Sequence, residues 1–201
     1  MNILFICTGN TCRSPMAEAL LTHKLPHSNV KSAGIFAGEG QQANQTALDA
    51  LKEKNITLDH RSKSVTDELL DWADLILTMT TQHKQSLILQ HPDFQDKYFT
   101  LKEYVSDEDN EVWKKLKTAY ANYEDKRSAF IQENKNKMNR LVLDQQLTSK
   151  LNEEVQEIQE LEAILISYDI SDPFGGSMNV YQQTLNELET YIDQLVKKIE
   201  K

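Results

Sequence analysis

The stretch Cys7-Thr8-Gly9-Asn10-Thr11-Cys12-Arg13-Ser14-Pro15 joins two segments of different pattern. Before it, Asn2–Ile6 is a short apolar run, which is typical of a buried strand. After it, Ser14–Lys24 carries apolar residues at helical spacing. A tight loop that leads from a strand into a helix is the building unit of an α/β sheet. The stretch therefore predicts the fold class of the residues around it.

The same alternation continues outward along the chain. Further strands are expected at Val30–Gly34, Asp74–Met79 and Lys97–Leu101, and further helices at Ala43–Lys54, Thr66–Trp72, Thr81–Gln90 and Ser177–Ile199. Thr66 is expected to be the N-cap of its helix, because Asp67 and Glu68 follow it. Strands that alternate with helices predict an α/β fold, here a four-stranded parallel sheet flanked by helices on both faces.

The middle of the chain interrupts this pattern. Neither glycine nor proline occurs between Pro92 and Pro173, and apolar or aromatic residues recur at steps of three and four from Leu116 onward. The spacing predicts a coiled-coil-like hairpin of two long antiparallel helices that reverses near Asp144–Ser149. A single long helix also fits the pattern.

This break in composition divides the chain into two parts. Residues 1–105 and 169–201 are expected to form one domain, and residues 107–167 a helical insertion into it. We expect the insertion to be structural. An arm for a docking partner or for self-association is the alternative, because a polar outer face fits both.

Composition excludes several functional classes. The 201 residues carry a net charge of −9, which disfavours binding to nucleic acid or to an anionic membrane. No apolar run is long enough to cross a bilayer, and the N-terminus lacks the features of a signal peptide. Cys7 and Cys12 cannot build a disulfide framework, and no histidine stands at ligand spacing to them, so no metal is expected. These features predict a soluble, cytoplasmic protein.

The quoted loop has the composition of a phosphate-binding site. Backbone N–H groups of a tight loop can all point inward and form an anion nest. Those groups would belong to Thr8, Gly9, Asn10, Thr11, Cys12 and Ser14. Gly9 and Asn10 tolerate positive φ, Ser14 suits the N-cap, and Pro15 suits the first helical position. The helix N-terminus adds positive potential, and Arg13 can offer a fork to two phosphoryl oxygens.

Cys7 stands at the start of this loop. A helix N-terminus and a nearby arginine stabilise a thiolate, so Cys7 is expected to attack phosphorus and form a phosphocysteine. The Ser14 hydroxyl is expected to donate a hydrogen bond to that thiolate. A buried structural cysteine is the alternative, and the surrounding Gly9, Asn10 and Ser-Pro disfavour it. Cys12 could form a reversible disulfide that protects Cys7 from overoxidation.

A second glycine-rich stretch, Ser171-Asp172-Pro173-Phe174-Gly175-Gly176-Ser177, precedes the last expected helix. Phosphoryl transfer needs a proton donor for the leaving group, and Asp172 on a loop could supply the proton. A turn followed by a helix cap explains the spacing equally well. The presence of the Cys7 loop in the same chain favours the catalytic role.

These residues resemble the low-molecular-weight protein tyrosine phosphatase family. The resemblance rests on the N-terminal Cys7-x5-Arg13-Ser14-Pro15, on Asp172-Pro173 and on Ser32-Ala33-Gly34, and it covers about 1–105 and 169–201. It implies a hydrolase without metal or cofactor, with Cys7 as nucleophile, Arg13 as phosphate clamp and Asp172 as general acid and then base. It also implies that Ser32 lies under the loop and holds Asn10 and Ser14. The helical insertion departs from the compact family pattern.

Two positions look more like the bacterial protein arginine phosphatase subgroup. Tyrosine-directed members usually carry a bulky aliphatic residue where this chain has Thr11, and a tyrosine where it has Phe174. A phosphoarginine guanidinium offers several hydrogen-bond donors, which an aliphatic neighbour would leave unpaired. The resemblance thus implies hydrolysis of phosphoarginine on proteins, with phosphorylated proteins as substrates and Phe174 in substrate binding.

Other functions fit part of the pattern. A low-molecular-weight phosphatase for phosphotyrosine is the nearest alternative. Arsenate reductase uses the same loop, but it relays oxidation through further cysteines, which this chain lacks. A non-catalytic phosphate-binding scaffold is disfavoured because Cys7, Arg13 and Asp172 are all present.

Overall fold

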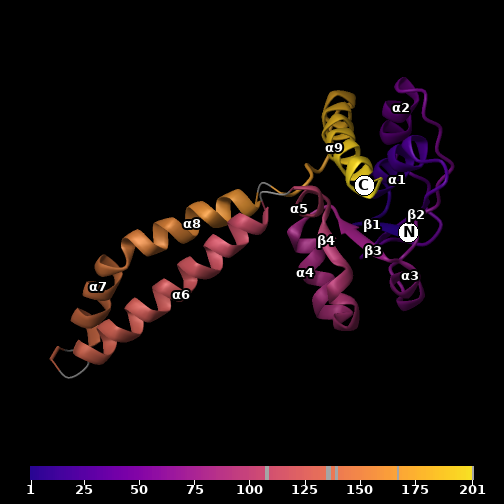
Figure 1. Cartoon of the computed structure of the whole chain (residues 1–201). Helices are drawn as coiled ribbons and strands as arrows, with labels where there is room; N and C mark the ends of the chain where they lie inside the picture. Colours follow the sequence, from indigo (N-terminus) through magenta and orange to yellow (C-terminus); the bar gives the residue numbers. More distant parts are fainter. Residues whose placement is uncertain (107–108, 135–136, 139, 167, 201) are drawn as a thin grey trace. The chain divides into compact units, whose positions relative to one another are not determined.

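The computed structural model of the protein describes residues 1–106, 109–134, 137–138, 140–166 and 168–200. The chain forms two compact units (Figure 1). The first consists of Met1–Ser106 and Tyr168–Lys201, and the second of Asp107–Ser167. None of the described helices is long and apolar enough to cross a membrane.

The first unit is built on a sheet of four parallel strands (Figure 1). The strands are β1 (Asn2–Cys7), β2 (Asn29–Gly34), β3 (Leu75–Thr78) and β4 (Tyr98–Thr100). Their order is β2-β1-β3-β4, so that Ile6 of β1 stands opposite Ala33 on one side and Thr78 on the other. The four-stranded parallel sheet predicted from the sequence is confirmed.

Side chains of β1 alternate between two hydrophobic cores. Ile3, Phe5 and Cys7 belong to one core, and Leu4 and Ile6 belong to the other. A strand that is buried on both faces needs an almost continuous apolar sequence, which is why Asn2–Ile6 is recognisable as a strand.

Helices cover both faces of this sheet. The core that contains Phe5 receives α1 (Arg13–Lys24), α2 (Gln45–Glu53), α5 (Leu101–Val105) and α9 (Met178–Ile199). The core that contains Leu4 receives α3 (Asp67–Trp72), α4 (Thr81–Gln90) and the short 3-10 helix η1 (Pro92–Lys97). The expected N-cap of α3 is confirmed, because Thr66 Oγ1 accepts a hydrogen bond from Leu69 N.

α5 was not predicted, and the last strand, expected over Lys97–Leu101, is shorter and ends at Thr100. The strand ends at Thr100 because Thr100 and Glu103 form a capping box, in which each side chain accepts from the other's backbone N–H. The Thr-x-x-Glu spacing that marks such a box is present in the sequence, so this element was detectable.

The strand order places β1 at the point where the winding of the chain changes direction. The chain passes from β1 to β2 on one side and later returns to β3 on the other. In open α/β sheets, ligands bind beyond the carboxyl ends of the strands at such a switch point. Cys7 is the last residue of β1, so its loop lies at the position that this fold uses for binding.

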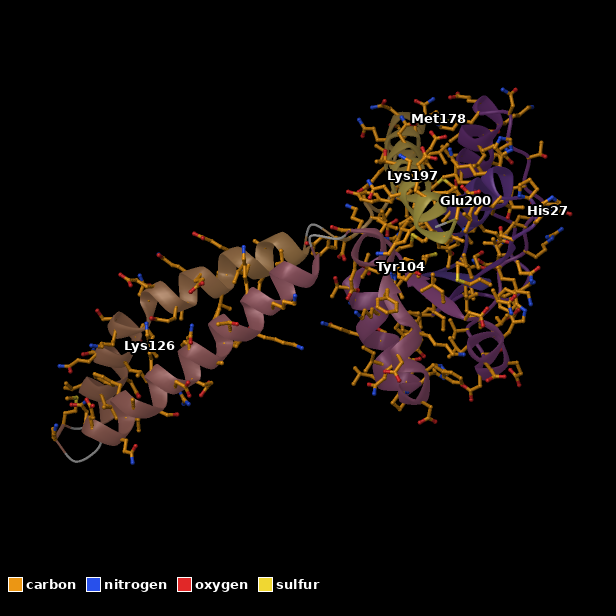
Figure 2. All side chains as sticks on the ribbon, viewed as in Figure 1. His27, Tyr104, Lys126, Met178, Lys197 and Glu200 are labelled. Carbon is orange, nitrogen blue, oxygen red and sulfur yellow. The ribbon has the colours of Figure 1, made fainter. Side chains whose placement is uncertain are left out.

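The second unit is a helical hairpin of α6 (Asp109–Asn134), α7 (Arg140–Lys150) and α8 (Asn152–Ile166). Figure 1 shows α6 running alongside α7 and α8. Its interior contains Leu116, Ala119, Leu151 and Ile158. Lys126 on α6, labelled in Figure 2, forms an ion pair with the buried Glu154 on α8.

The reversal predicted near Asp144–Ser149 is wrong, because those residues lie inside α7. Within α7, Thr148 Oγ1 donates to Asp144 O at 2.9 Å, so its hydroxyl is satisfied in the helix. α6 ends at Asn134 and α7 begins at Arg140, and that segment contains three asparagines in its sequence. Asparagine favours turns because its side chain competes for backbone hydrogen bonds. The single long helix is also wrong.

Candidate active site

The Cys7 sulfur is enclosed by the loop that follows it. Cys7 is 3% exposed, and its Sγ lies 3.0 Å from Ser14 Oγ. The backbone N–H of Asn10 donates to the same sulfur at 3.3 Å. The sulfur at the end of β1 is therefore held between a hydroxyl and a backbone N–H.

Asn10 shapes this loop through its backbone and its side chain. Its φ of 54° is left-handed, and its amide Nδ2 donates to Ser14 Oγ at 3.0 Å and to Ser32 Oγ at 2.8 Å. Its Oδ1 accepts from the backbone N–H of Lys63 at 2.9 Å. Of the two residues that were expected to tolerate positive φ, Asn10 adopts it and Gly9 does not. Asparagine alone makes the turn, because its buried amide is held at three points.

Residues at the end of β2 are in contact with the loop that follows Cys7. Backbone N–H groups of Ile35 and Phe36 donate to the carbonyl oxygens of Cys7 and Thr8. A Cβ atom on Gly34 would lie 2.6 Å from Thr8 O and 2.8 Å from Asn10 N. Any side chain at Gly34 would therefore push the loop away.

α1 begins one residue earlier than the sequence predicted. Its first residue is Arg13 and its N-cap is Cys12, so the prediction of Ser14 as N-cap is wrong. Ser14 is fully buried and its hydroxyl contacts Cys7 and Asn10. It cannot cap the helix because its side chain points into the loop. Pro15 is the third residue of α1 and not the first, as was predicted, but it lies in the first turn, where its missing N–H leaves no bond unmade.

The structure brings Asp172 to the loop from the far end of the chain. Arg13 Nη2 forms a salt bridge with Asp172 Oδ2 at 2.7 Å, and Arg13 Nη1 donates to Ile170 O at 3.4 Å. The side chain of Arg13 is 6% exposed, whereas that of Asp172 is 52% exposed. Asp172 is thus accessible from solvent while it contacts a buried guanidinium. Phe174, which is 75% exposed, donates its backbone N–H to Asp172 Oδ1.

Three polar residues beside the loop were not identified from the sequence. His83 Nε2 lies 2.8 Å from Thr8 Oγ1, and its Nδ1 lies 2.8 Å from Thr80 Oγ1. Burial, together with the charge of Arg13, lowers the pKa of His83 to about 4. This histidine is therefore neutral at neutral pH. His83 stands 75 residues from Thr8 in the sequence, so no local sequence pattern predicts their contact.

The other two residues are Glu18, which contacts Ser32, and His60, which contacts Asn10. Ser32 Oγ donates to Glu18 Oε2 at 2.6 Å, and burial raises the pKa of Glu18. His60 Nε2 lies 2.9 Å from Asn10 O. Glu18 follows Ser14 by four residues on the same helix face, which is a signal that sequence analysis could have used.

Thr11 and Cys12 differ in burial and in their contacts. Cys12 is 5% exposed, its Sγ lies 3.4 Å from Tyr181 OH on α9, and burial raises the pKa of its thiol. Thr11 is half-buried, and its Oγ1 is 3.7 Å from Cys12 Sγ and 3.7 Å from where a Cβ of Gly9 would lie. The Thr11 hydroxyl thus makes one long contact to sulfur and lies over Gly9.

Among the described residues, no group of three or more His, Cys, Asp or Glu side chains is arranged to hold a metal ion.

Comparison with known proteins agrees with this geometry. A family model described as low molecular weight phosphotyrosine protein phosphatase matches residues 2–157. The protein-arginine-phosphatase of Geobacillus stearothermophilus is 38% identical over 199 residues, 98% of this chain and 95% of that protein. The low molecular weight protein-tyrosine-phosphatase PtpB of Staphylococcus epidermidis is 30% identical over 200 residues, 100% of both chains.

A solved structure extends the comparison to three dimensions. It is a YwlE arginine phosphatase mutant with a phosphorylated active-site serine, and it is 36% identical to this chain. The match has a TM-score of 0.67 and covers 100% of this chain and 97% of that one. The fold and the family resemblance predicted from the Cys7 loop are confirmed by these matches.

Proposed function

Because the chain belongs to the low molecular weight phosphotyrosine protein phosphatase family, we propose that it hydrolyses phosphoarginine on proteins. The choice of phosphoarginine over phosphotyrosine rests on Thr11, a half-buried residue whose hydroxyl belongs to the loop that follows Cys7. A guanidinium needs acceptors for its N–H groups, and a hydroxyl supplies one where an aliphatic side chain would not. The 38% identity to a named protein-arginine-phosphatase supports the same choice.

The first chemical step forms a covalent intermediate. Cys7 Sγ attacks phosphorus, the sulfur–phosphorus bond forms, and the bond from phosphorus to the guanidinium nitrogen breaks. Asp172 transfers its proton to the departing nitrogen. Arg13 and the backbone N–H groups of the loop hold the phosphoryl oxygens. The phosphorylated serine in the matched solved structure supports phosphoryl transfer to a residue of the active site in a relative.

The pairing of Arg13 with Asp172 suggests how the acid is released for this step. The two groups are 2.7 Å apart. A phosphoryl group would compete for the same guanidinium and replace Asp172 as its partner. Asp172, released from Arg13, is then free to face the leaving group.

The second step regenerates the enzyme. Water attacks phosphorus, the sulfur–phosphorus bond breaks, and Asp172 accepts the proton of that water. Ser14 stabilises the departing thiolate, because its hydroxyl is 3.0 Å from Cys7 Sγ. The products are phosphate and the free enzyme, and no cofactor is needed.

Thr11→Ile tests the choice of substrate. Isoleucine keeps the branched Cβ but replaces the hydroxyl by an apolar extension, so guanidinium donors lose an acceptor while a phenyl ring gains an apolar contact. An unmade hydrogen bond to a charged group costs about 1.5–3 kcal/mol, or roughly ten- to a hundredfold. The ratio of kcat/KM for phosphoarginine to kcat/KM for phosphotyrosine peptides should fall by that factor.

Thr11→Ser is the matched control, because serine keeps the hydroxyl and loses the methyl group. It should retain the wild-type preference. If Thr11→Ile leaves the ratio unchanged, the hydroxyl does not select the substrate, and the phosphotyrosine phosphatase alternative is favoured.

We also propose that Cys12 protects Cys7 from oxidation. Peroxide converts the Cys7 thiolate to a sulfenic acid, and the Cys12 thiol then displaces water to form a disulfide. In wild type, inactivation by mild peroxide should be reversed by a thiol reductant. In Cys12→Ser it should become irreversible, because the sulfenic acid has no partner and is oxidised further. Recovery of Cys12→Ser to the wild-type level under reductant would refute this role.

The remaining proposals concern context. Phosphorylated proteins are the proposed substrates. The cytoplasm is the proposed location, because Cys7 and Cys12 are both free thiols and such thiols persist in a reducing compartment. Residues 1–105 and 169–201 carry the proposed catalytic residues. The helical hairpin of residues 107–167 is proposed to be structural, and its removal should leave the chemistry of Cys7 in place.

A further inference from the structure

The loop that carries Asp172 follows directly on the helical hairpin in sequence. The chain leaves the first unit after Ser106 and returns to it at Tyr168, four residues before Asp172. A general acid must be held close to one geometry, because a displacement of about 1 Å can cost on the order of a hundredfold in rate. The loop of residues 169–177, called the Asp172 loop below, therefore needs its own attachment to the first unit.

Lys102 provides one such attachment. Its side chain is 9% exposed, and its Nζ donates to Asp169 O at 2.9 Å and lies 2.7 Å from Glu187 Oε1. Lys102 belongs to α5, the last helix before the chain leaves the first unit, and Asp169 is the second residue after its return. One buried ammonium group thus joins the two chain segments that flank the hairpin.

Glu187 on α9 continues the attachment toward Asp172. Its Oε2 accepts from Ser171 Oγ at 2.6 Å and from Ser171 N at 3.1 Å. Burial alone would raise the pKa of Glu187, but hydrogen bonds from Lys102 and Ser171 outweigh burial and lower it. The carboxylate is charged at neutral pH and accepts from both neighbours. Ser171 immediately precedes Asp172 in the chain.

Further contacts fix the start of the same loop. Asp169 Oδ1 accepts from Thr81 N at 2.7 Å, at the first turn of α4. The backbone N–H of Ile170 donates to Met79 O at 2.8 Å, just beyond β3. Ser171 Oγ also lies 3.0 Å from the fully buried Thr184 Oγ1. Residues 169–171 are therefore attached to α4, α5, α9 and the end of β3, while Asp172 itself is half-exposed.

We infer that Lys102, Glu187 and Ser171 form a positioning anchor that holds Asp172 in place for proton transfer to the leaving group. The three residues act through Asp172 and do not touch the substrate. This inference rests on the proposed phosphatase function. The anchor keeps the Asp172 loop fixed although a 61-residue unit, Asp107–Ser167, precedes this loop in the sequence.

Ser171→Ala is the sharpest test, because Ser171 is exposed and its removal leaves the Lys102–Glu187 pair intact. The substrates are a phosphoarginine peptide, a phosphotyrosine peptide and 4-nitrophenyl phosphate, whose leaving group needs no proton. We expect kcat/KM to fall about tenfold on both peptides and to stay within about twofold on 4-nitrophenyl phosphate. Ser28→Ala removes a hydrogen bond of the same length, 2.6 Å to Leu25 O, and should change none of the three.

Two further variants extend the test. Lys102→Met and Glu187→Gln should show the same selective loss on the peptides. The loss should be larger for Lys102→Met, because Glu187 loses its ion-pair partner and Asp169 O loses its hydrogen-bond donor. In an Asp172→Ala background, Ser171→Ala should cause no further loss on the peptides, since the group that it positions is already absent.

The outcomes separate the anchor from a merely structural role. An equal loss on peptides and on 4-nitrophenyl phosphate, no loss on either, or full additivity with Asp172→Ala would each overturn the inference. A wild-type chain that hydrolyses phosphotyrosine but not phosphoarginine would refute the proposed substrate instead. The anchor would then be judged from the phosphotyrosine peptide, which also has a poor leaving group.

Discussion

Cys7→Ser is expected to abolish turnover while the fold and phosphate binding are retained. The sulfur is the nucleophile, and a serine hydroxyl is far less nucleophilic, so the loss should be at least roughly 10⁴-fold in kcat. Phosphate binding should persist because it depends on Arg13 and on the backbone N–H groups, which the substitution leaves in place. Serine is also slightly smaller than cysteine, so the buried site should accommodate it.

The measurement is a phosphate-release assay combined with calorimetric titration of inorganic phosphate and a thermal unfolding curve. A folded Cys7→Ser protein that binds phosphate and releases none from substrate is the expected result. Substantial turnover by this variant would contradict the phosphocysteine mechanism.

Asp172→Ala should give the second largest effect, and its size should depend on the leaving group. A general acid contributes about 10²–10⁴-fold where the leaving group needs a proton. We therefore expect a loss in that range in kcat/KM for phosphoarginine and phosphotyrosine peptides. The loss on 4-nitrophenyl phosphate should be far smaller, because nitrophenolate departs without a proton. kcat/KM is the appropriate quantity because it reports the step in which the leaving group departs.

Asp172→Asn is the matched control for shape. Asparagine has the same size and can still accept from Phe174 N, but it cannot donate an acidic proton. Asp172→Asn should therefore lose as much activity on the peptides as Asp172→Ala. Equal losses on peptides and on the aryl phosphate would remove Asp172 from the acid role.

The features that sequence predicted well are local. The strand before Cys7 and the helix after it are set by their apolar spacing, and the left-handed turn is set by Asn10. The capping residue Thr66 was also identified, because an N-cap depends on residues within one turn. Each of these features is decided by neighbours along the chain.

The features that sequence missed depend on packing between distant segments. His83 meets Thr8 only because β3, which precedes α4, lies beside β1 in the sheet. Lys102 meets Glu187 only because α5 and α9 pack on the same face of the sheet. The contact of the Ser14 hydroxyl with Cys7 was expected from the sequence, but Ser14 was also assigned to the helix cap, and one buried hydroxyl held by Cys7 and Asn10 cannot serve both purposes. The position of the hairpin reversal was missed because asparagines are weaker turn signals than glycine or proline.

The most direct test of the proposed function compares two peptides of identical sequence that differ in one residue, phosphoarginine or phosphotyrosine. The measurement is kcat/KM for each with the wild-type chain at neutral pH, where phosphoarginine is intact. We expect phosphoarginine to be preferred by at least about tenfold, the least that one unmade hydrogen bond to a charged group would cost the rejected substrate. A higher kcat/KM for phosphotyrosine would contradict it and would identify the chain as a tyrosine phosphatase.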